Sequence, residues 1–296
     1  MQVHLIDGTY ELFRAYYGAP SHRTATGQEV GASRSLLRSF AAFVTLDEVT
    51  HVGVAFDTVI ESFRNRLFAG YKTGEGIDPL LHAQFPLAER ITRALGMVTW
   101  SMVEFEADDA LATFALRASD DPRVTQVRIC SPDKDLCQCV RGERVVLCNR
   151  KTSELTNEEG VNRRLGVRPE QVPALLALVG DSADGIPGIA RWGMKSAQKV
   201  LAVYPTLTEI PDDGSSWQVS VRGAAGLSHE LSRARDDAAL YQRLATLYTD
   251  VPIDEEVDDL SWRGPDWAEL TALCDELDAA DVLGRLSPTE DASVDH

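Results

Sequence analysis

The chain has 296 residues, 44% of them hydrophobic and 25% charged, which is typical of a globular protein and excludes a disordered one. No apolar run reaches the ~18 residues of a membrane span, the N-terminus lacks the basic start of a signal peptide, and five cysteines without an export signal favour the cytoplasm. The formal net charge is −17, but residues 251–296 hold 14 acidic and two basic side chains. Much of the negative charge is therefore in this segment, and the net charge does not exclude a local phosphate-binding face elsewhere in the chain.

Short β-branched apolar runs alternate with helical patterns in the first half of the chain. We expect strands at 3–6, 51–56, 127–130 and 144–148, and helices near 31–46, 78–95 and 107–118. This alternation predicts an α/β fold with a mostly parallel twisted sheet flanked by helices. From about residue 156 the strand signals stop and the patterns become helical. We therefore expect an α/β core over 1–155, a helical region over 156–285 and an acidic tail over 286–296.

Carboxylates follow the expected strands at the points where these strands end. Asp7 ends the first strand and Asp57 the second, while Asp133 and Asp135 follow the third. Functional sites of open α/β sheets lie at the carboxyl ends of the strands. Each of these residues alone could instead cap a helix or form an Asx-turn.

Two further acidic groups make the set harder to explain by caps and turns. Glu106, Asp108 and Asp109 open the helix in FEADDALATFA, and Asp181 and Asp184 lie one helical turn apart in GDSADG. Nine carboxylates at one sheet edge would repel one another unless cations neutralised them. Oxygen ligands without a His or Cys cluster suit Mg²⁺ or Mn²⁺, and a pair of such ions can clamp a phosphodiester during hydrolysis.

A basic segment, SFRNRLFAGYK, carries Arg64, Arg66 and Lys72. Arg64 and Lys72 are eight residues apart, so two helical turns would place both on one face. Cations beside a metal cluster can hold the scissile phosphate and stabilise charge in the transition state. A solvated helix face is the alternative interpretation.

A second basic segment, GIPGIARWGMKSAQKVL (185–201), joins a tight connection to a helix. Backbone N–H groups at such a turn and at the helix N-terminus can bind phosphates. Lys195 and Lys199 add positive charge one turn apart. This predicts contacts that position a duplex without reading its sequence, with an ordinary αα-hairpin as the alternative.

Five motifs occur in an order and spacing that resemble the bacterial and phage 5′-nucleases, which include the 5′→3′ exonuclease domain of DNA polymerase I and the flap endonucleases. The motifs are LIDGTYELFRAYY, FDTVIESFRNRLFAGYK, EFEADDALATFA, SPDKDLCQCV and GDSADGIPGIARWGMKSA. They extend from residue 5 to about residue 200. The resemblance implies a PIN-like core, a helical arch or clamp near 60–90, and a helix–three-turn–helix motif near 175–203.

The resemblance also implies roles for individual residues. The positions matching a first metal site are Asp7, Asp57, Glu106 and Asp108. Those matching a second site are Asp133, Asp135 and Asp184, with Asp109 and Asp181 close by or bound to the metal through water. Arg64 and Lys72 match catalytic residues that contact the scissile phosphate. The positions expected to bind DNA are Arg14, Tyr17, Gly188, Arg191, Gly193, Lys195, Ser196 and Lys199, and some family members bind K⁺ at the duplex-binding turn.

The sequence therefore predicts a Mg²⁺- or Mn²⁺-dependent 5′→3′ exonuclease or flap endonuclease that acts in DNA replication and repair by a two-metal mechanism. We expect a stand-alone, cytoplasmic monomer whose partners are DNA and replication or repair proteins. Glu75 stands where the family often has an arginine, which affects how the arch handles the 5′ strand. The alternatives are a flap-binding protein with little or no nuclease activity and a PIN-type ribonuclease, although small PIN ribonucleases lack the duplex-binding segment.

Overall fold

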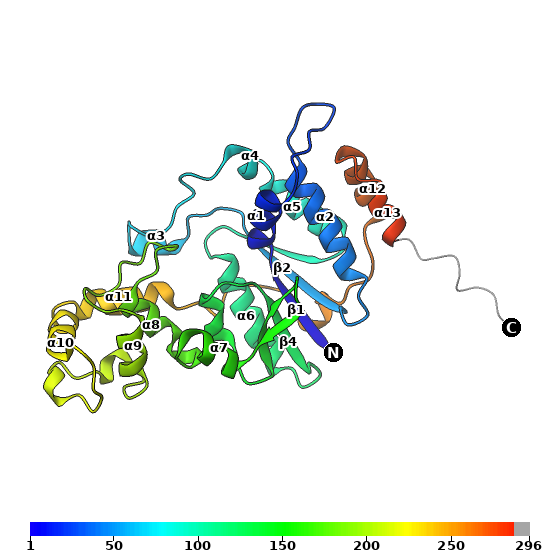
Figure 1. Ribbon diagram of the computed structural model, residues 1–296. Coiled ribbons are helices and arrows are strands. Elements are labelled where there is room, and N and C mark those ends of the chain that lie inside the picture. Colours follow the sequence, from blue (N-terminus) through cyan, green and yellow to red (C-terminus); the bar gives the residue numbers. More distant parts are fainter. Residues whose placement is uncertain (287–296) are drawn as a thin grey trace.

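The computed structural model describes residues 1–286, so the predicted acidic tail over 286–296 lies outside the described part apart from its first residue. Its centre is a six-stranded sheet with the strand order β3-β2-β1-β4-β5-β6 (Figure 1). All neighbouring strands are parallel except β6, which is antiparallel to β5. The strands are β1 (Gln2–Asp7), β2 (His51–Asp57), β3 (Val98–Met102), β4 (Gln126–Cys130), β5 (Val145–Asn149) and β6 (Glu154–Thr156).

The predicted α/β fold and the four predicted strands are confirmed. Two strands are additional. The sequence VTWSM of β3 mixes apolar and polar residues because this strand is at an edge of the sheet and only Trp100 in it is buried. The three residues of β6 are too few to give a periodic pattern.

Helices cover both faces of the sheet because successive strand residues point to opposite sides. Leu5 and Ile6, for example, belong to two different buried clusters. The first face packs against α6 (Ala107–Asp120), which contacts β1, β2, β3 and β4. The helices grouped over the second face are α1 (Gly8–Gly18), α2 (Gly31–Val44), α4 (Pro79–His82) and α5 (Phe85–Ala94). The helix predicted over 78–95 is thus two helices, and α1 was not predicted.

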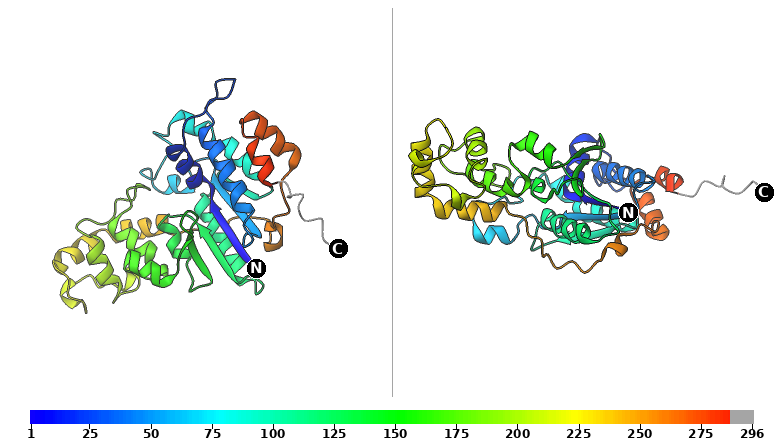
Figure 2. Two further views of the ribbon diagram at one scale, coloured as in Figure 1. Left: turned by 45° about the vertical axis from the view of Figure 1, so that its right-hand side comes forward. Right: turned by 90° about the horizontal axis from the view of Figure 1, so that it is seen from below.

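Most of the helices that follow the sheet form a body at one side of the molecule. They are α7 (Glu158–Leu165), α8 (Val172–Val179), α9 (Met194–Leu201), α10 (Ala224–Arg233) and α11 (Arg235–Ala245). Short 3₁₀ helices are η1 (Asp135–Cys139), η2 (Pro169–Gln171), η3 (Leu207–Glu209), η4 (Gly214–Ser216) and η5 (Val257–Leu260). The closest association is between α8 and α11. This body extends away from the sheet, as the green and yellow ribbons of Figure 2 show.

The last two helices do not belong to this body. After α11 the chain returns past the sheet, and α12 (Trp267–Glu276) and α13 (Asp281–Leu286) pack on α5 and α2 at the opposite end of the molecule (Figure 2). Arg38 of α2 forms an ion pair with Asp281 at 2.7 Å, and Arg90 of α5 forms one with Glu276 at 2.6 Å. The helical segment predicted over 156–285 is therefore divided between two locations. Across residues 1–286 no helix combines the length and the apolarity that crossing a membrane requires.

Candidate active site

The carboxyl edge of the sheet gathers acidic side chains around its central strand. β1 lies between β2 and β4, so the order of the strands along the sheet changes direction there. Asp7 ends β1, Asp57 ends β2, and Asp133 follows β4. Ligands of open α/β sheets bind in the crevice outside such a reversal. The fold therefore brings these three predicted residues to one place.

Asp7 is held from two directions. Its Oδ1 accepts a hydrogen bond from the backbone N–H of Tyr10 at 2.8 Å, which caps α1, and its Oδ2 accepts one from the Ser131 hydroxyl at 2.9 Å. Burial raises the pKa of Asp7 to about 7, and the neighbouring charges of Asp57 and Asp133 act in the same direction. Asp7 therefore caps α1 and at the same time lies among other carboxylates.

Two more carboxylates share this environment. Asp57 accepts a hydrogen bond from the backbone N–H of Ala107 at 2.8 Å, which joins β2 to the start of α6. Burial raises the pKa of Asp57. The pKa of Asp108 is raised by burial and by the charges of Asp133 and Asp7. Each ionised carboxylate here makes ionisation of its neighbours less favourable. A bound cation would relieve this repulsion.

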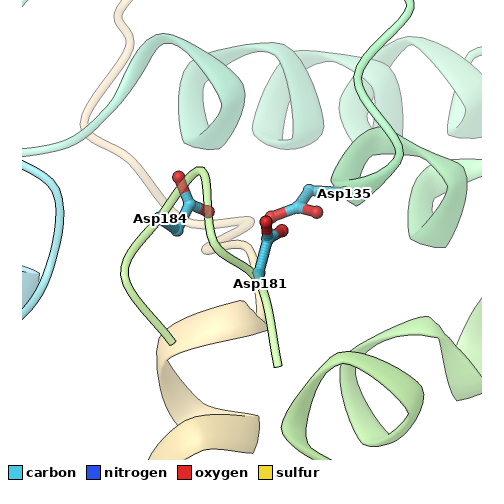
Figure 3. A group of neighbouring side chains, drawn as sticks. All are labelled: Asp135, Asp181 and Asp184. Carbon is cyan, nitrogen blue, oxygen red and sulfur yellow. The ribbon is translucent and has the colours of Figure 1, made fainter. Parts of the chain in front are cut away.

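A second acidic group lies where the sheet meets the helical body. Carboxylate oxygens of Asp135, Asp181 and Asp184 are all within 4.8 Å of one another. Asp135 starts η1, and the other two lie on the loop after α8, with their carboxyl groups turned toward a common space (Figure 3). Asp135 Oδ1 is buried and has no hydrogen-bond partner. Burial, together with the charge of Asp133, raises the pKa of Asp135. An unpartnered oxygen among close carboxylates fits a hard divalent cation.

Two lysines supply positive charge to these carboxylates. Lys72 Nζ lies 2.9 Å from Glu106 Oε2 and 3.2 Å from Asp184 Oδ1, so it bridges the two acidic groups. Lys134 Nζ lies 2.5 Å from Asp181 Oδ2. Lys134 was missed by the sequence reasoning, although its position between Asp133 and Asp135 in SPDKD is a signal that could have found it.

The prediction that Arg64 and Lys72 share a helical face is wrong. Helix α3 (Phe63–Leu67) ends five residues before Lys72. Arg64 is fully buried, and its guanidinium donates to Asp109 at 2.7 Å through both terminal nitrogens. It also donates to the backbone carbonyls of Leu244 at 2.9 Å and Thr246 at 3.0 Å. Such a side chain does not reach a phosphate in solvent.

Asp109 is engaged in the same contacts. Both of its oxygens accept hydrogen bonds from Arg64, and in addition Oδ2 accepts from the backbone N–H of Glu106 at 3.0 Å and Oδ1 from that of Tyr248 at 2.8 Å. These four bonds occupy the carboxylate, so it offers no ligand to a metal. Arg64 also lies 3.1 Å from Glu106, whose pKa is lowered by Lys72 and Arg64 despite its burial. The pair therefore positions Glu106 and the start of α6.

The predicted duplex-binding turn joins α8 to α9. Gly188 has φ +73°, and a Cβ there would lie 2.4 Å from the backbone nitrogen of Gly180, so only glycine allows this close approach. Gly193 precedes α9 as its N-cap. Lys195 and Lys199 are exposed on α9. The Ser196 hydroxyl bonds locally, accepting from the N–H of Gly193 and donating to its carbonyl.

The other residues predicted to bind DNA differ in their exposure and in the partners that they already have. Tyr17 is 74% exposed on α1, as a stacking residue needs to be. Arg14 forms an ion pair with Glu11. Arg191 is an exposed non-glycine residue with φ +68°, and its guanidinium lies over Gly226. Glu75 is exposed on the loop between α3 and α4.

A mostly parallel sheet with a carboxylate-rich edge and an adjoining helix–turn–helix module defines a nuclease with a PIN-like core. Comparison with protein families identifies it more closely. The N-terminal resolvase-like domain of the 5′-3′ exonucleases matches residues 2–166, and their C-terminal SAM fold matches residues 167–268. The chain belongs to the 5′-3′ exonuclease family.

Curated relatives include a protein of similar length. The 5′-3′ exonuclease of Aquifex aeolicus is 30% identical over 284 residues, covering 95% of this chain and 93% of that protein. DNA polymerase I of Pseudomonas aeruginosa is 34% identical over 293 residues, covering 95% of this chain. The chain spans only 31% of that polymerase.

Solved structures show the same fold at low sequence identity. The T5 5′-exonuclease with bound zinc has a TM-score of 0.66 and 16% identity, covering 97% of both chains. The catalytic core of Rad2 in complex with a DNA substrate has a TM-score of 0.59 and 13% identity, covering 96% of this chain and 91% of that one.

Proposed function

We propose that this chain hydrolyses phosphodiester bonds of DNA at 5′ ends, nicks and 5′ flaps, with Mg²⁺ or Mn²⁺ as cofactor. The observation that carries the proposal is the acidic edge itself. Asp7, Asp57, Asp108 and Asp135 all have raised pKa values because they are buried close to other carboxylates. A protein keeps such a destabilising group of charges where a ligand neutralises it.

The proposed metal ligands fall into two groups. Asp7, Asp57, Glu106 and Asp108 would serve one ion, and Asp133, Asp135, Asp181 and Asp184 would serve another, with the unpartnered Asp135 Oδ1 as the strongest support. Bound divalent ions would supply a water of lowered pKa and stabilise the charge on the leaving oxygen. Asp109 is left out of both groups because Arg64 and two backbone N–H groups saturate it.

Lys72 is the proposed phosphate-binding residue. Its side chain is 28% exposed, and it lies between the two acidic groups. Once cations neutralise Glu106 and Asp184, its ammonium group can donate to a phosphate oxygen instead. Arg64 acts as a positioning residue, because it holds Glu106 and Asp109 from inside the protein.

The turn between α8 and α9 is the proposed binding site for duplex DNA. Exposed Lys195 and Lys199 lie on the first turns of α9, whose N-terminal N–H groups add to the attraction for phosphate. Carbonyl groups of the turn could bind K⁺. Because these contacts are to the backbone, they fix the distance from duplex to cut without reading a sequence.

Cleavage of a labelled double-flap DNA tests the proposal. We expect cutting at the flap junction with Mg²⁺ or Mn²⁺, none with EDTA, and products that carry a 5′-phosphate. Asp135→Asn should abolish cutting and retain DNA binding. Asp120→Asn is the matched control, because this exposed residue lies at the other end of α6, about 18 Å from Asp108 at ~1.5 Å per residue.

The rival functions give different results in the same assay. Tight flap binding without cutting in any metal would identify a DNA-binding protein. Cutting of single-stranded RNA in preference to the flap would identify a PIN-type ribonuclease. Wild-type turnover by Asp135→Asn would refute the assignment of the second acidic group.

A further inference from the structure

Two thiols lie side by side at the carboxyl edge of the sheet, next to the proposed active site. β4 and β5 are parallel, and their register pairs Ile129 with Leu147. The next residues on the two strands are Cys130 and Cys148. Both belong to the buried cluster on the α1–α2 face, so their side chains point to the same side of the sheet. Neighbouring strands are ~4.8 Å apart, within the ~4.4–6.8 Å between Cα atoms that disulfides span.

This thiol pair also borders a cavity. A cavity of about 100 Å³ is lined by both cysteines together with Glu11, Arg14 and Arg150, among others. A small oxidant can therefore approach sulfur atoms that bulk solvent barely reaches, since Cys148 is only 9% exposed.

The charges around the pair favour one thiolate. The adjacent Cys130 thiol and the positive charges of Arg128 and Arg150 lower the pKa of Cys148 to about 7. Arg150 is fixed in place, because its guanidinium lies 4.4 Å from the centre of the Phe43 ring and 2.9 Å from Glu11. The lowered pKa favours the thiolate of Cys148, which is the form of a thiol that reacts with peroxide.

We propose that Cys130 and Cys148 are a peroxide-sensitive dithiol that closes to a disulfide and thereby slows the adjoining active site. The Cys148 thiolate attacks one oxygen of hydrogen peroxide, and the O–O bond breaks. Hydroxide departs, and Cys148 becomes a sulfenic acid. The Cys130 sulfur then attacks the Cys148 sulfur, the S–O bond breaks, and water leaves with the Cys130 proton. The two thiols are oxidised together, and one peroxide is reduced to two waters.

Ser131 is the route by which this change would reach the site. It follows Cys130 directly, its hydroxyl donates to Asp7 Oδ2 at 2.9 Å, and its oxygen accepts from the N–H of Asp133 at 3.2 Å. Drawing Cys130 toward Cys148 shifts Ser131, and with it two proposed metal-binding carboxylates. Because a misplacement of ~1 Å can cost ~100-fold in rate, we expect the disulfide form to cleave on the order of tenfold more slowly or worse.

The covalent step goes beyond the proposed function and is tested without a nuclease readout. The full chain is treated in EDTA with one equivalent of hydrogen peroxide, and its free thiols are counted and its peptides mapped by mass spectrometry. We expect five thiols to fall to three, a mass loss of about 2 Da for one new S–S bond, a Cys130–Cys148 cross-linked peptide, and full recovery with dithiothreitol. Five remaining thiols, a Cys137–Cys139 cross-link or a stable Cys148 sulfinic acid would each overturn the proposal.

Variants keep the test specific. Cys148→Ser should leave no reversible cross-link and a cleavage rate that peroxide does not change. Cys274→Ser is the matched control, because Cys274 is also a buried cysteine but lies in α12, and it should behave as the wild type. Circular dichroism establishes that each variant is folded. If Cys148→Ser does not fold, the peptide map of the wild type still decides the covalent step. An oxidised wild type that carries the cross-link and cleaves at full rate would refute the effect on the site.

Discussion

Replacing Arg64 tests whether this residue stabilises the protein interior or contacts the substrate directly. Its side chain is fully buried, donates twice to Asp109 at 2.7 Å, and also bonds the carbonyls of Leu244 and Thr246. Arg64→Ala would leave Asp109 buried without its charge partner. Removing one member of a buried ion pair costs about 3–5 kcal/mol of stability. We expect a loss of that size in the free energy of unfolding.

The assay is urea denaturation in EDTA, followed by circular dichroism. Arg66→Ala is the matched control, because Arg66 lies two residues away with its side chain 66% exposed, in an ion pair with Glu104. Exposed pairs contribute ~0–1 kcal/mol, so the control should barely change the midpoint. A double variant, Arg64→Met with Asp109→Leu, should lose less than the sum of the two single changes, since it leaves no isolated charge.

One result would refute the reasoning. Suppose that the free energy of unfolding of Arg64→Ala lies within ~1 kcal/mol of the wild-type value, which is the contribution of an exposed ion pair, and that the variant no longer cleaves. Arg64 is then not held as the structure shows. It would then act on the substrate, as the sequence predicted.

Four further changes test the site. Lys72→Ala should lower single-turnover flap cleavage by ~100-fold or more, the effect of losing one transition-state donor; an unchanged rate would remove Lys72 from the chemistry. Mg²⁺ should raise the unfolding midpoint of the wild type, because it binds only the folded state, and should raise that of Asp135→Asn much less. The pKa of Asp7 is raised from 3.8 to about 7 by folding, so the folded state retains a proton that the unfolded state loses. Stability in EDTA should therefore fall as the pH rises from about 4 to about 7, and Asp7→Asn should flatten that slope. Lys195→Ala should weaken duplex binding and reduce the salt slope by about one phosphate contact, whereas Arg263→Ala, at the other side of the molecule, should not.

The sequence predicted those features that depend on neighbouring residues in the chain. Buried strands followed by Asp7 and Asp57 were predictable because short β-branched runs and the carboxyl-edge rule both act locally. The loop of Asp181 and Asp184 was also found from its spacing. Its approach to Asp135 was part of the expectation that nine carboxylates converge at one sheet edge, but no local pattern specifies it, because the two segments are 46 residues apart.

The sequence was least informative where burial decides which groups a side chain contacts. Arg64 lies in a basic pattern that is typical of a phosphate contact, and nothing in that pattern shows that Leu244 and Thr246 cover it from 180 residues away. Asp108 and Asp109 are adjacent acidic residues at a helix start, and the residue types alone do not show what each one contacts. Their difference arises from what each one meets. Asp109 contacts Arg64 and the backbone N–H of Tyr248, whereas Asp108 lies near the charges of Asp133 and Asp7.

The return of α12 and α13 to the α2–α5 surface has a consequence for synthesis. His22 meets Asp278 at 2.9 Å and Arg38 meets Asp281. These partners follow 256 and 243 residues later in the chain, so the contacts form only after that length has been synthesised. Until then, apolar side chains of α2 and α5, such as Leu37 and Ile91, lack the cover of Leu273 and Leu277. Partly exposed apolar surface of this kind promotes aggregation of nascent chains. We therefore expect the N-terminal layer to be most prone to aggregation in the interval before α12 and α13 have been made.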